Sequence, residues 1–203
     1  RAAQDIGEGH IGLACDVTDP EACERAASAC LDRWGHIDVL VNNAGVSEPL
    51  KLMDIAPKNY ERVVGVNLGG TLYMSQAVVP AMRARGKGSI VNIASVSGQR
   101  GGGIFGGPHY SAAKAGIMGL TKAMARELAG EGVRVNAVCP GLIDTDITTG
   151  MADSQRQDLI ASIPMGRIGV PDDVAGCVLF LASDLSAYCT GTEVDVNGGS
   201  HIH

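Results

Sequence analysis

A tyrosine and a lysine four residues apart, Tyr110 and Lys114, are the residues of this chain whose types and spacing best suit chemistry. They lie in a stretch with helical periodicity, so their side chains can occupy neighbouring positions on one helix face. A lysine ammonium near a phenol favours the phenolate and lowers a pKa that starts near about 10. A tyrosine tuned in this way can donate or accept a proton near neutral pH. From spacing alone, an ordinary surface pair on an amphipathic helix is the simpler interpretation.

The apolar stripe of the same helix indicates where the pair lies. Its members follow one another at spacings of four, three, four and four: Ala113, Ile117, Leu120, Met124 and Leu128. At about 100° per residue, Tyr110 falls on the edge of this stripe and Lys114 just outside it. The pattern therefore predicts that both side chains lie at the seam between core and solvent, where a pocket could open.

Strand-like and helix-like segments alternate along the whole chain. Apolar runs predict strands at 10–17, 37–42, 89–95, 133–139 and 192–199. Helical patterns occupy 21–34, 57–85, 109–130 and 171–183, with a short helix expected within the polar stretch 143–170. This alternation, with uninterrupted apolar strands, predicts an α/β fold in which helices cover both faces of a doubly wound parallel, Rossmann-like sheet. Residues 1–203 are expected to form a single domain.

Polar residues and glycines follow the predicted strands, at the edge where ligands bind in such sheets. They are Asp16-Val17, Asn42 to Gly45, Ser95 and Pro140-Gly141. Two glycine patterns resemble a dinucleotide fingerprint but lack its context. GEGHIG (7–12) precedes a strand instead of following one, and the glycines of 101–106 begin too long after theirs. We interpret 101–106 as a flexible loop at a pocket rim.

Composition excludes several classes of protein. The net charge of −6 and the 3% aromatic content disfavour nucleic acid and anionic membranes as partners. No apolar run approaches the length of about 18–20 residues that spans a bilayer. The six cysteines form no CxxC pair and are expected to be free thiols in a reducing cytoplasm. We expect no metal site, because His201 and His203 alone cannot supply three or four ligands.

Several motifs together resemble those of the short-chain dehydrogenase/reductase family. In chain order these are Cys15-Asp-Val-Thr-Asp19, Asn42-Asn-Ala-Gly45, Val66-Asn-Leu68, Asn92-Ile-Ala-Ser95, Tyr110-Ser-Ala-Ala-Lys114, Pro140-Gly-Leu-Ile-Asp-Thr145, and the ending from Thr190-Gly191 to Gly198-Gly199. Each motif is weak alone. Their shared order across nearly the whole chain is specific, and the ending is most similar to 3-oxoacyl-carrier-protein reductases and sugar or polyol dehydrogenases.

The resemblance implies a role for each of four residues in an oxidoreductase acting on a carbonyl or secondary alcohol. Tyr110 would be the general acid/base, and Lys114 would lower its pKa and hydrogen-bond the nicotinamide ribose. Ser95 would hold the substrate oxygen, and Asn67 would anchor a water that links Lys114 to solvent. The cofactor would be NAD or NADP, whose chemistry the protein positions.

The resemblance also implies the cofactor contacts. Besides Tyr110 and Lys114, they are Asp16 and Val17 at the adenine, Asn43, Ala44 and Gly45 at the ribose side, Pro140 and Gly141, and Ile143 and Thr145 at the carboxamide. A cytoplasmic homotetramer is expected by the same resemblance. A catalytically silent family member acting as an assembly or binding subunit is the alternative, which the intact set of four residues disfavours.

Two features depart from the family pattern. Ser95 and Tyr110 are 15 positions apart, a longer gap than is common, which leaves the substrate open. The chain also begins after the first strand, the glycine loop and the strand that selects the cofactor. We therefore expect a longer natural protein, and a domain that lacks its first βαβ unit here. A protein beginning at Arg1 is expected to be poorly soluble or unfolded and not to bind NAD or NADP.

Overall fold

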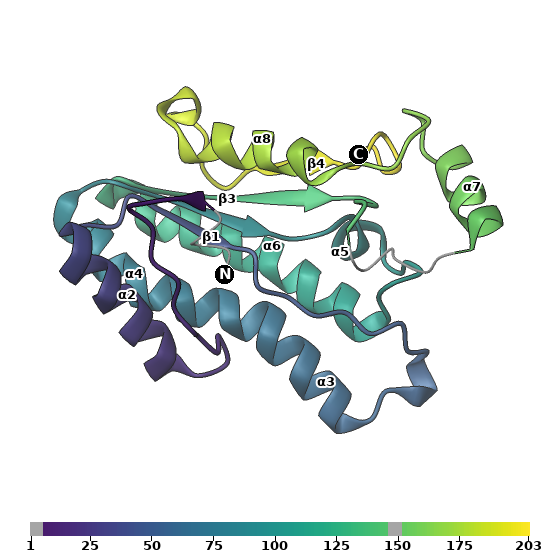
Figure 1. Ribbon diagram of the computed structural model, residues 1–203, viewed down its shortest axis with the longest axis horizontal. Coiled ribbons are helices and arrows are strands. Elements are labelled where there is room, and N and C mark those ends of the chain that lie inside the picture. The colour runs from purple at the N-terminus through teal and green to yellow at the C-terminus, as the bar shows by residue number, and fades with distance from the viewer. Residues whose placement is uncertain (1–5, 146–151) are drawn as a thin grey trace.

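A parallel four-stranded sheet forms the centre of the computed structural model, which describes residues 6–145 and 152–203. The strands are β1 (Val39–Asn42), β2 (Gly88–Ile93), β3 (Val133–Pro140) and β4 (Glu193–Val196), and they lie side by side in that order (Figure 1). Every neighbouring pair is parallel. The predicted α/β fold with a parallel sheet is confirmed.

Helices cover both faces of this sheet, as the alternation predicted (Figure 1). On one side lie α2 (Pro20–Trp34), α3 (Pro57–Val64), α4 (Gly70–Arg85) and α6 (Pro108–Leu128), and on the other lies α8 (Pro171–Ala182). The short helices α5 (Val96–Arg100) and α7 (Asp153–Ala161) lie beyond the carboxyl ends of the strands. Within residues 6–145 and 152–203, every helix is too short or too polar to span a lipid bilayer.

Strand β2 has apolar residues at consecutive positions because both of its faces are covered. Ile90 packs with Met82 and Val135 in the core beneath α4 and α6. Its neighbour Val91 points to the opposite face and packs with Leu181 of α8. Because successive side chains of a strand point to opposite faces, a sheet covered on both sides needs apolar residues at consecutive positions.

Buried amides link the sheet to the helices below it. Asn42 at the end of β1 lies opposite Asn92 of β2. The Asn42 Nδ2 donates to Asn92 Oδ1 at 2.9 Å and to Ser75 Oγ of α4 at 3.1 Å. The Asn92 Nδ2 in turn donates to Thr121 Oγ1 of α6 at 2.9 Å. These bonds connect two strands and two helices through side chains that are all buried.

Three details differ from the sequence predictions. Residues 10–17 are not part of the sheet, because a strand needs a hydrogen-bonded neighbour and no strand among the described residues pairs with this segment. The predicted helix 57–85 is interrupted by a π-helical turn, Gly65–Gly69. The residues between β2 and the predicted rim loop 101–106 form α5, whose first turn is capped by the Ser95 side chain.

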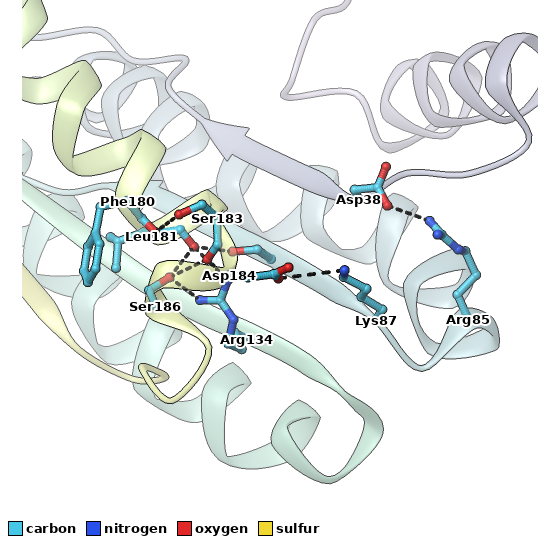
Figure 2. A network of polar contacts seen from close by, with 10 residues as sticks. Asp38, Arg85, Lys87, Arg134, Phe180, Leu181, Ser183, Asp184 and Ser186 are labelled. Carbon is cyan, nitrogen blue, oxygen red and sulfur yellow. Dashed lines mark hydrogen bonds and ion pairs between the residues drawn. The ribbon is translucent and has the colours of Figure 1, made fainter.

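Arg134 of β3 anchors the segment that follows α8 at the amino-terminal edge of the sheet (Figure 2). Its guanidinium donates to Leu181 O at 3.0 Å, Ser183 O at 3.2 Å and Ser186 Oγ at 2.9 Å. Leu181 O also accepts from Ser186 Oγ at 3.0 Å, so the arginine completes a closed network. The carbonyl groups at the end of α8 have no further turn of helix to bond with, and the arginine satisfies them.

We expect Arg134→Met to destabilise the protein, because it removes the charged donor that bonds Leu181 O, Ser183 O and Ser186 Oγ together. The free energy of unfolding should fall by about 1–3 kcal/mol, the usual range for hydrogen bonds that involve a charged group. Urea unfolding followed by circular dichroism measures the change. Arg126→Met on the exposed side of α6 is the matched control and should change stability by less than about 0.5 kcal/mol. Equal stability of the two variants would contradict the anchoring role.

Candidate active site

A cavity of about 540 Å³ opens at the carboxyl ends of β1, β2 and β3. Its lining includes most of the residues singled out in the sequence: Asn43, Gly45, Asn67, Ser95, Tyr110, Lys114, Pro140, Gly141, Ile143 and Thr145. These residues come from segments far apart in the chain, and the parallel sheet brings them to one edge. The volume is within the range typical of small-molecule sites.

Ser95 and Tyr110 meet inside this cavity. Ser95 lies two residues after the end of β2, and its Oγ accepts a hydrogen bond from Ser97 N at 3.1 Å as it caps α5. The Tyr110 side chain lines the same cavity. Burial raises the pKa of Tyr110, and the nearby Ser95 side chain opposes that rise. The pair thus places a phenol and a hydroxyl where one oxygen atom of a ligand could contact both.

Lys114 is buried, with only 5% of its surface exposed. Its Nζ donates to the carbonyl oxygen of Ile93 at 2.6 Å and lies 5.7 Å from the centre of the Tyr110 ring. Burial lowers the pKa of Lys114 to about 8. The lysine therefore changes its charge close to neutral pH.

The electrostatics differ from the sequence prediction in two respects. Lys114 was expected at the seam between core and solvent, but it lies in the interior. The pKa of Tyr110 was expected to fall, but it is raised, because desolvation of the phenol dominates and the lysine is bonded to Ile93 instead. Ser95, not Lys114, is the group that lowers the pKa of the tyrosine in this structure.

Asn67 lies in the π-helical turn between α3 and α4, a kind of distortion often found at functional sites. Its Nδ2 donates to Val46 O and Val63 O, both at 2.8 Å, which fixes the side chain. Its Oδ1 is buried and has no hydrogen-bond partner. A Cβ built on Gly45 would lie 2.8 Å from this oxygen, so only glycine fits there. The unpaired oxygen faces the cavity wall near Lys114 and suits a bound donor.

Three of the predicted cofactor residues do not line this cavity: Asp16, Val17 and Ala44. The Asp16 carboxylate accepts hydrogen bonds from Thr18 N at 2.9 Å and Thr18 Oγ1 at 2.8 Å. Val17 packs against Gly70 at the start of α4, where an added Cβ would lie 2.6 Å from its side chain. Their proposed contacts with the adenine stay predictions.

Several cavity residues were not predicted from the sequence. Apolar and polar side chains are added by the structure: Val46, Ser47, Val96, Ser97, Arg100, Leu142 and Leu159. The predicted rim loop contributes Gly103, Ile104, Phe105 and Gly106. One signal was readable, since a serine before a helical turn is a common N-cap, which would have predicted α5 after Ser95. Nothing in the local sequence indicates the rest.

Comparisons with known proteins agree with this geometry. A family model described as enoyl-(acyl carrier protein) reductase matches residues 1–201. The protein y4mP of Sinorhizobium fredii, described as an uncharacterized short-chain type dehydrogenase/reductase, is 54% identical over 195 residues, which cover 96% of this chain and 77% of that protein. The 3-oxoacyl-[acyl-carrier-protein] reductases FabG of Vibrio cholerae and Escherichia coli are 42% and 40% identical over 197 residues, or 97% of this chain and 80% of each relative.

The chain belongs to the short-chain dehydrogenase/reductase family. It is an enzyme of the oxidoreductase class, as the resemblance read from its motifs implied. NAD(P) is the cofactor class of this family.

The residues present fit a nicotinamide dinucleotide. The buried, unpaired Asn67 Oδ1 and the close approach at Gly45 mark a place where a polar group is expected next to the backbone. Lys114 offers a buried ammonium in the same part of the cavity. A ribose hydroxyl and a carboxamide are the kinds of group that such donors and acceptors bind.

We expect Lys114→Met to stabilise the protein in the absence of cofactor. The pKa of Lys114 is about 8 in the folded chain, against an ordinary value of 10.5. Between these pH values the unfolded chain holds more protons, so the free energy of unfolding rises with pH. Below pH 8 the lysine is charged in the folded chain, and its full desolvation penalty lowers the free energy of unfolding. Methionine removes that penalty. The variant should melt at a higher temperature than the parent at pH 7, and the difference should shrink as the pH rises from 8 to 10.5.

Thermal unfolding at a series of pH values tests this expectation. Lys58→Met, an exposed position on α3, is the matched control and should show no such pH dependence. A Lys114→Met variant that is less stable at pH 7, by an amount independent of pH, would show that the lysine is not desolvated.

Proposed function

We propose that this protein is an NAD(P)-dependent carbonyl reductase or alcohol dehydrogenase in which Tyr110 is the general acid/base. The observation that carries the proposal is the meeting of four side chains at one cavity: Asn67, Ser95, Tyr110 and Lys114. A silent assembly subunit would have no need of a serine and a tyrosine in one cavity beside a desolvated lysine. Nothing in the comparisons favours that alternative.

The proton step belongs to Tyr110 and Ser95. Both side chains line the cavity, where the phenol Oη and the serine Oγ could contact one substrate carbonyl oxygen. During reduction, Tyr110 Oη gives its proton to that oxygen while Ser95 holds the oxygen in place. The raised pKa of Tyr110 keeps the phenol protonated at neutral pH, which suits the direction of carbonyl reduction.

Lys114 and Asn67 complete the site. Lys114 lies near the Tyr110 ring and changes its charge near pH 8, so it can return a proton to the phenolate after the reaction. The free Oδ1 of Asn67 can accept from a water that links the lysine to solvent. A bound nicotinamide cofactor supplies or accepts the hydride.

The cofactor would be held by residues that follow two strand ends and by one residue of a helix. Asn43 and Gly45 follow β1, Lys114 comes from α6, and Ile143 and Thr145 follow β3. Asp16 and Val17 complete the proposed set at the adenine. We assign the cofactor only as NAD or NADP. A homotetramer in the cytoplasm is proposed on the family resemblance alone.

A 3-oxoacyl thioester is the first substrate class to test. Two relatives that are 40% and 42% identical carry the name of 3-oxoacyl-[acyl-carrier-protein] reductases. The outer wall of the cavity is apolar at Val96, Ile104 and Phe105, which suits an acyl chain. Sugars and polyols are the second class to test, and they would need a more polar wall.

We expect Tyr110→Phe to lower the turnover of any good carbonyl substrate by about 10²- to 10⁴-fold, the usual contribution of a positioned acid/base. Cofactor affinity should stay within about threefold, because phenylalanine keeps the packing of the ring. Steady-state reduction followed at 340 nm and a fluorescence titration with NADH and NADPH measure the two quantities. Tyr60→Phe on α3, at a tyrosine that is 52% exposed, is the control. Near-parental turnover by Tyr110→Phe would refute the assignment.

Ser95→Ala should shift the pH–rate profiles of both carbonyl reduction and alcohol oxidation to higher pH. The serine lowers the pKa of Tyr110, so its loss raises that pKa further. Alcohol oxidation, which needs the phenolate, then begins at higher pH, and carbonyl reduction persists to higher pH. Ser47→Ala, in the same cavity wall, serves as the comparison and should leave the profile in place. A shift toward lower pH in Ser95→Ala would contradict the proposed electrostatics.

A further inference from the structure

A contact between a partly buried carboxylate and a buried imidazole lies next to the residues that line the cavity. Glu48 Oε2 is 3.5 Å from His109 Nε2, and the His109 side chain is only 1% exposed. His109 immediately precedes Tyr110 in the first turn of α6. Neither Glu48 nor His109 lines the cavity, so neither is expected to touch substrate or cofactor.

Glu48 is the centre of a larger set of contacts. Its Oε2 also accepts from Asn59 Nδ2 at 3.0 Å, and its Oε1 pairs with Arg62. Both partners belong to α3. The hydrogen bonds from Asn59, His109 and Arg62 together lower the pKa of Glu48, so the carboxylate is charged at neutral pH. One anion therefore joins the segment after β1 to two helices.

The backbone repeats the same connection. Gly107 N donates to Glu48 O at 2.8 Å, just before α6 begins. A Cβ built on Gly107 would lie 2.3 Å from Leu50 O and 3.1 Å from the His109 ring, so these groups are in close contact. Because a side chain larger than hydrogen does not fit, the start of α6 is pressed against the segment 48–50.

The two segments that this contact joins both contribute residues to the lining of the cavity. Residues 43–47, immediately before Glu48, contribute Asn43, Gly45, Val46 and Ser47. Residues immediately around His109 contribute Gly106 and Tyr110. The separation of the walls therefore depends on what holds residue 48 against residue 109.

We propose that Glu48 and His109 form a positioning pair that fixes the wall carrying Tyr110 relative to the wall carrying Asn43 and Gly45. The pair sets where the phenol lies relative to Ser95 and to a ligand held by residues 43–47. The inference rests on the proposed function of Tyr110, and it adds two residues outside the cavity to the machinery that supports it. Catalysis is sensitive to such placement, because a misplacement of about 1 Å can cost about 100-fold in rate.

The position of the imidazole indicates which of its nitrogens donates to Glu48. Its Nδ1 is buried with no hydrogen-bond partner, so a proton there would be unsatisfied. The remaining nitrogen, Nε2, faces the Glu48 carboxylate and carries the hydrogen atom. A glutamine at position 109 could present its amide NH₂ to the same carboxylate, whereas phenylalanine keeps a ring of similar size without a donor.

The test compares His109→Phe, His109→Gln and Glu48→Gln in the full-length enzyme. We expect His109→Phe to lower kcat by about 10- to 100-fold with little change in KM, because binding groups stay while the proton donor moves. His109→Gln should restore kcat to within about threefold of the parent. In the double variant His109→Phe/Glu48→Gln, the loss should be smaller than the sum of the two single losses, because both changes act on the Glu48–His109 contact, while Glu48→Gln also weakens the contacts with Asn59 and Arg62. Glu61→Gln, an exposed acid on α3, is the matched control.

Two further measurements separate positioning from general stability. Thermal unfolding shows whether each variant is fully folded at the assay temperature. Hydrogen–deuterium exchange of the peptides covering 43–50 and 106–112 should be faster in His109→Phe than in Glu61→Gln, with other peptides unchanged. This exchange measurement needs no substrate, so it tests the pair even if the parent reduces no carbonyl compound, a result that would count against the proposed function alone.

Each outcome decides for or against the pair. Loss of kcat in folded His109→Phe, rescue by glutamine and faster exchange confined to the two segments would support it. Unchanged kcat and exchange in His109→Phe would overturn it. A loss that follows the melting temperature in every variant, with no rescue by glutamine, would also overturn it by showing a purely structural role.

Discussion

The buried amide ladder at the ends of β1 and β2 is the interaction on which the site depends. Asn42 bonds to Asn92 across the strands, and Asn92 bonds to Thr121 of α6. The residue after Asn42 is a cavity residue, and the residue after Asn92 provides the carbonyl that holds Lys114. Buried amides must find partners, so only one register of the two strands and one position of the helix satisfy both asparagines. The ladder thereby fixes three cavity walls at their base.

Desolvation gives this site its chemical character. Burial lowers the pKa of Lys114 to about 8 and raises that of Tyr110. The two ordinary values lie near 10, and burial moves them in opposite directions because one group is charged when protonated and the other when deprotonated. The desolvation of Lys114 is unfavourable for folding, and such a penalty at a functional site is a common trade between stability and activity.

The two edges of the sheet serve different purposes. At the carboxyl edge, strands end in glycines and polar residues that leave a cavity. At the amino edge, Arg134 satisfies the carbonyl groups that end α8, and its network holds the segment after that helix. A parallel sheet places every strand end of one kind at the same edge, so chemistry and anchoring are separated by the length of a strand.

Local sequence determined much of this protein, because strand and helix periods and short motifs are properties of neighbouring residues. The parallel α/β fold, the helical Tyr110–Lys114 pair and the strand-end residues at one edge were all predictable in this way. The predicted strand at 10–17 was wrong, since strand pairing depends on a neighbour that local sequence does not reveal. Tertiary structure alone decided the burial of Lys114, its bond to Ile93 and the contact of Glu48 with His109. The bond of Lys114 to Ile93 joins residues 21 positions apart, and the contact of Glu48 with His109 joins residues 61 positions apart. The desolvation of a group is set by all the atoms packed around it and not by its neighbours in sequence.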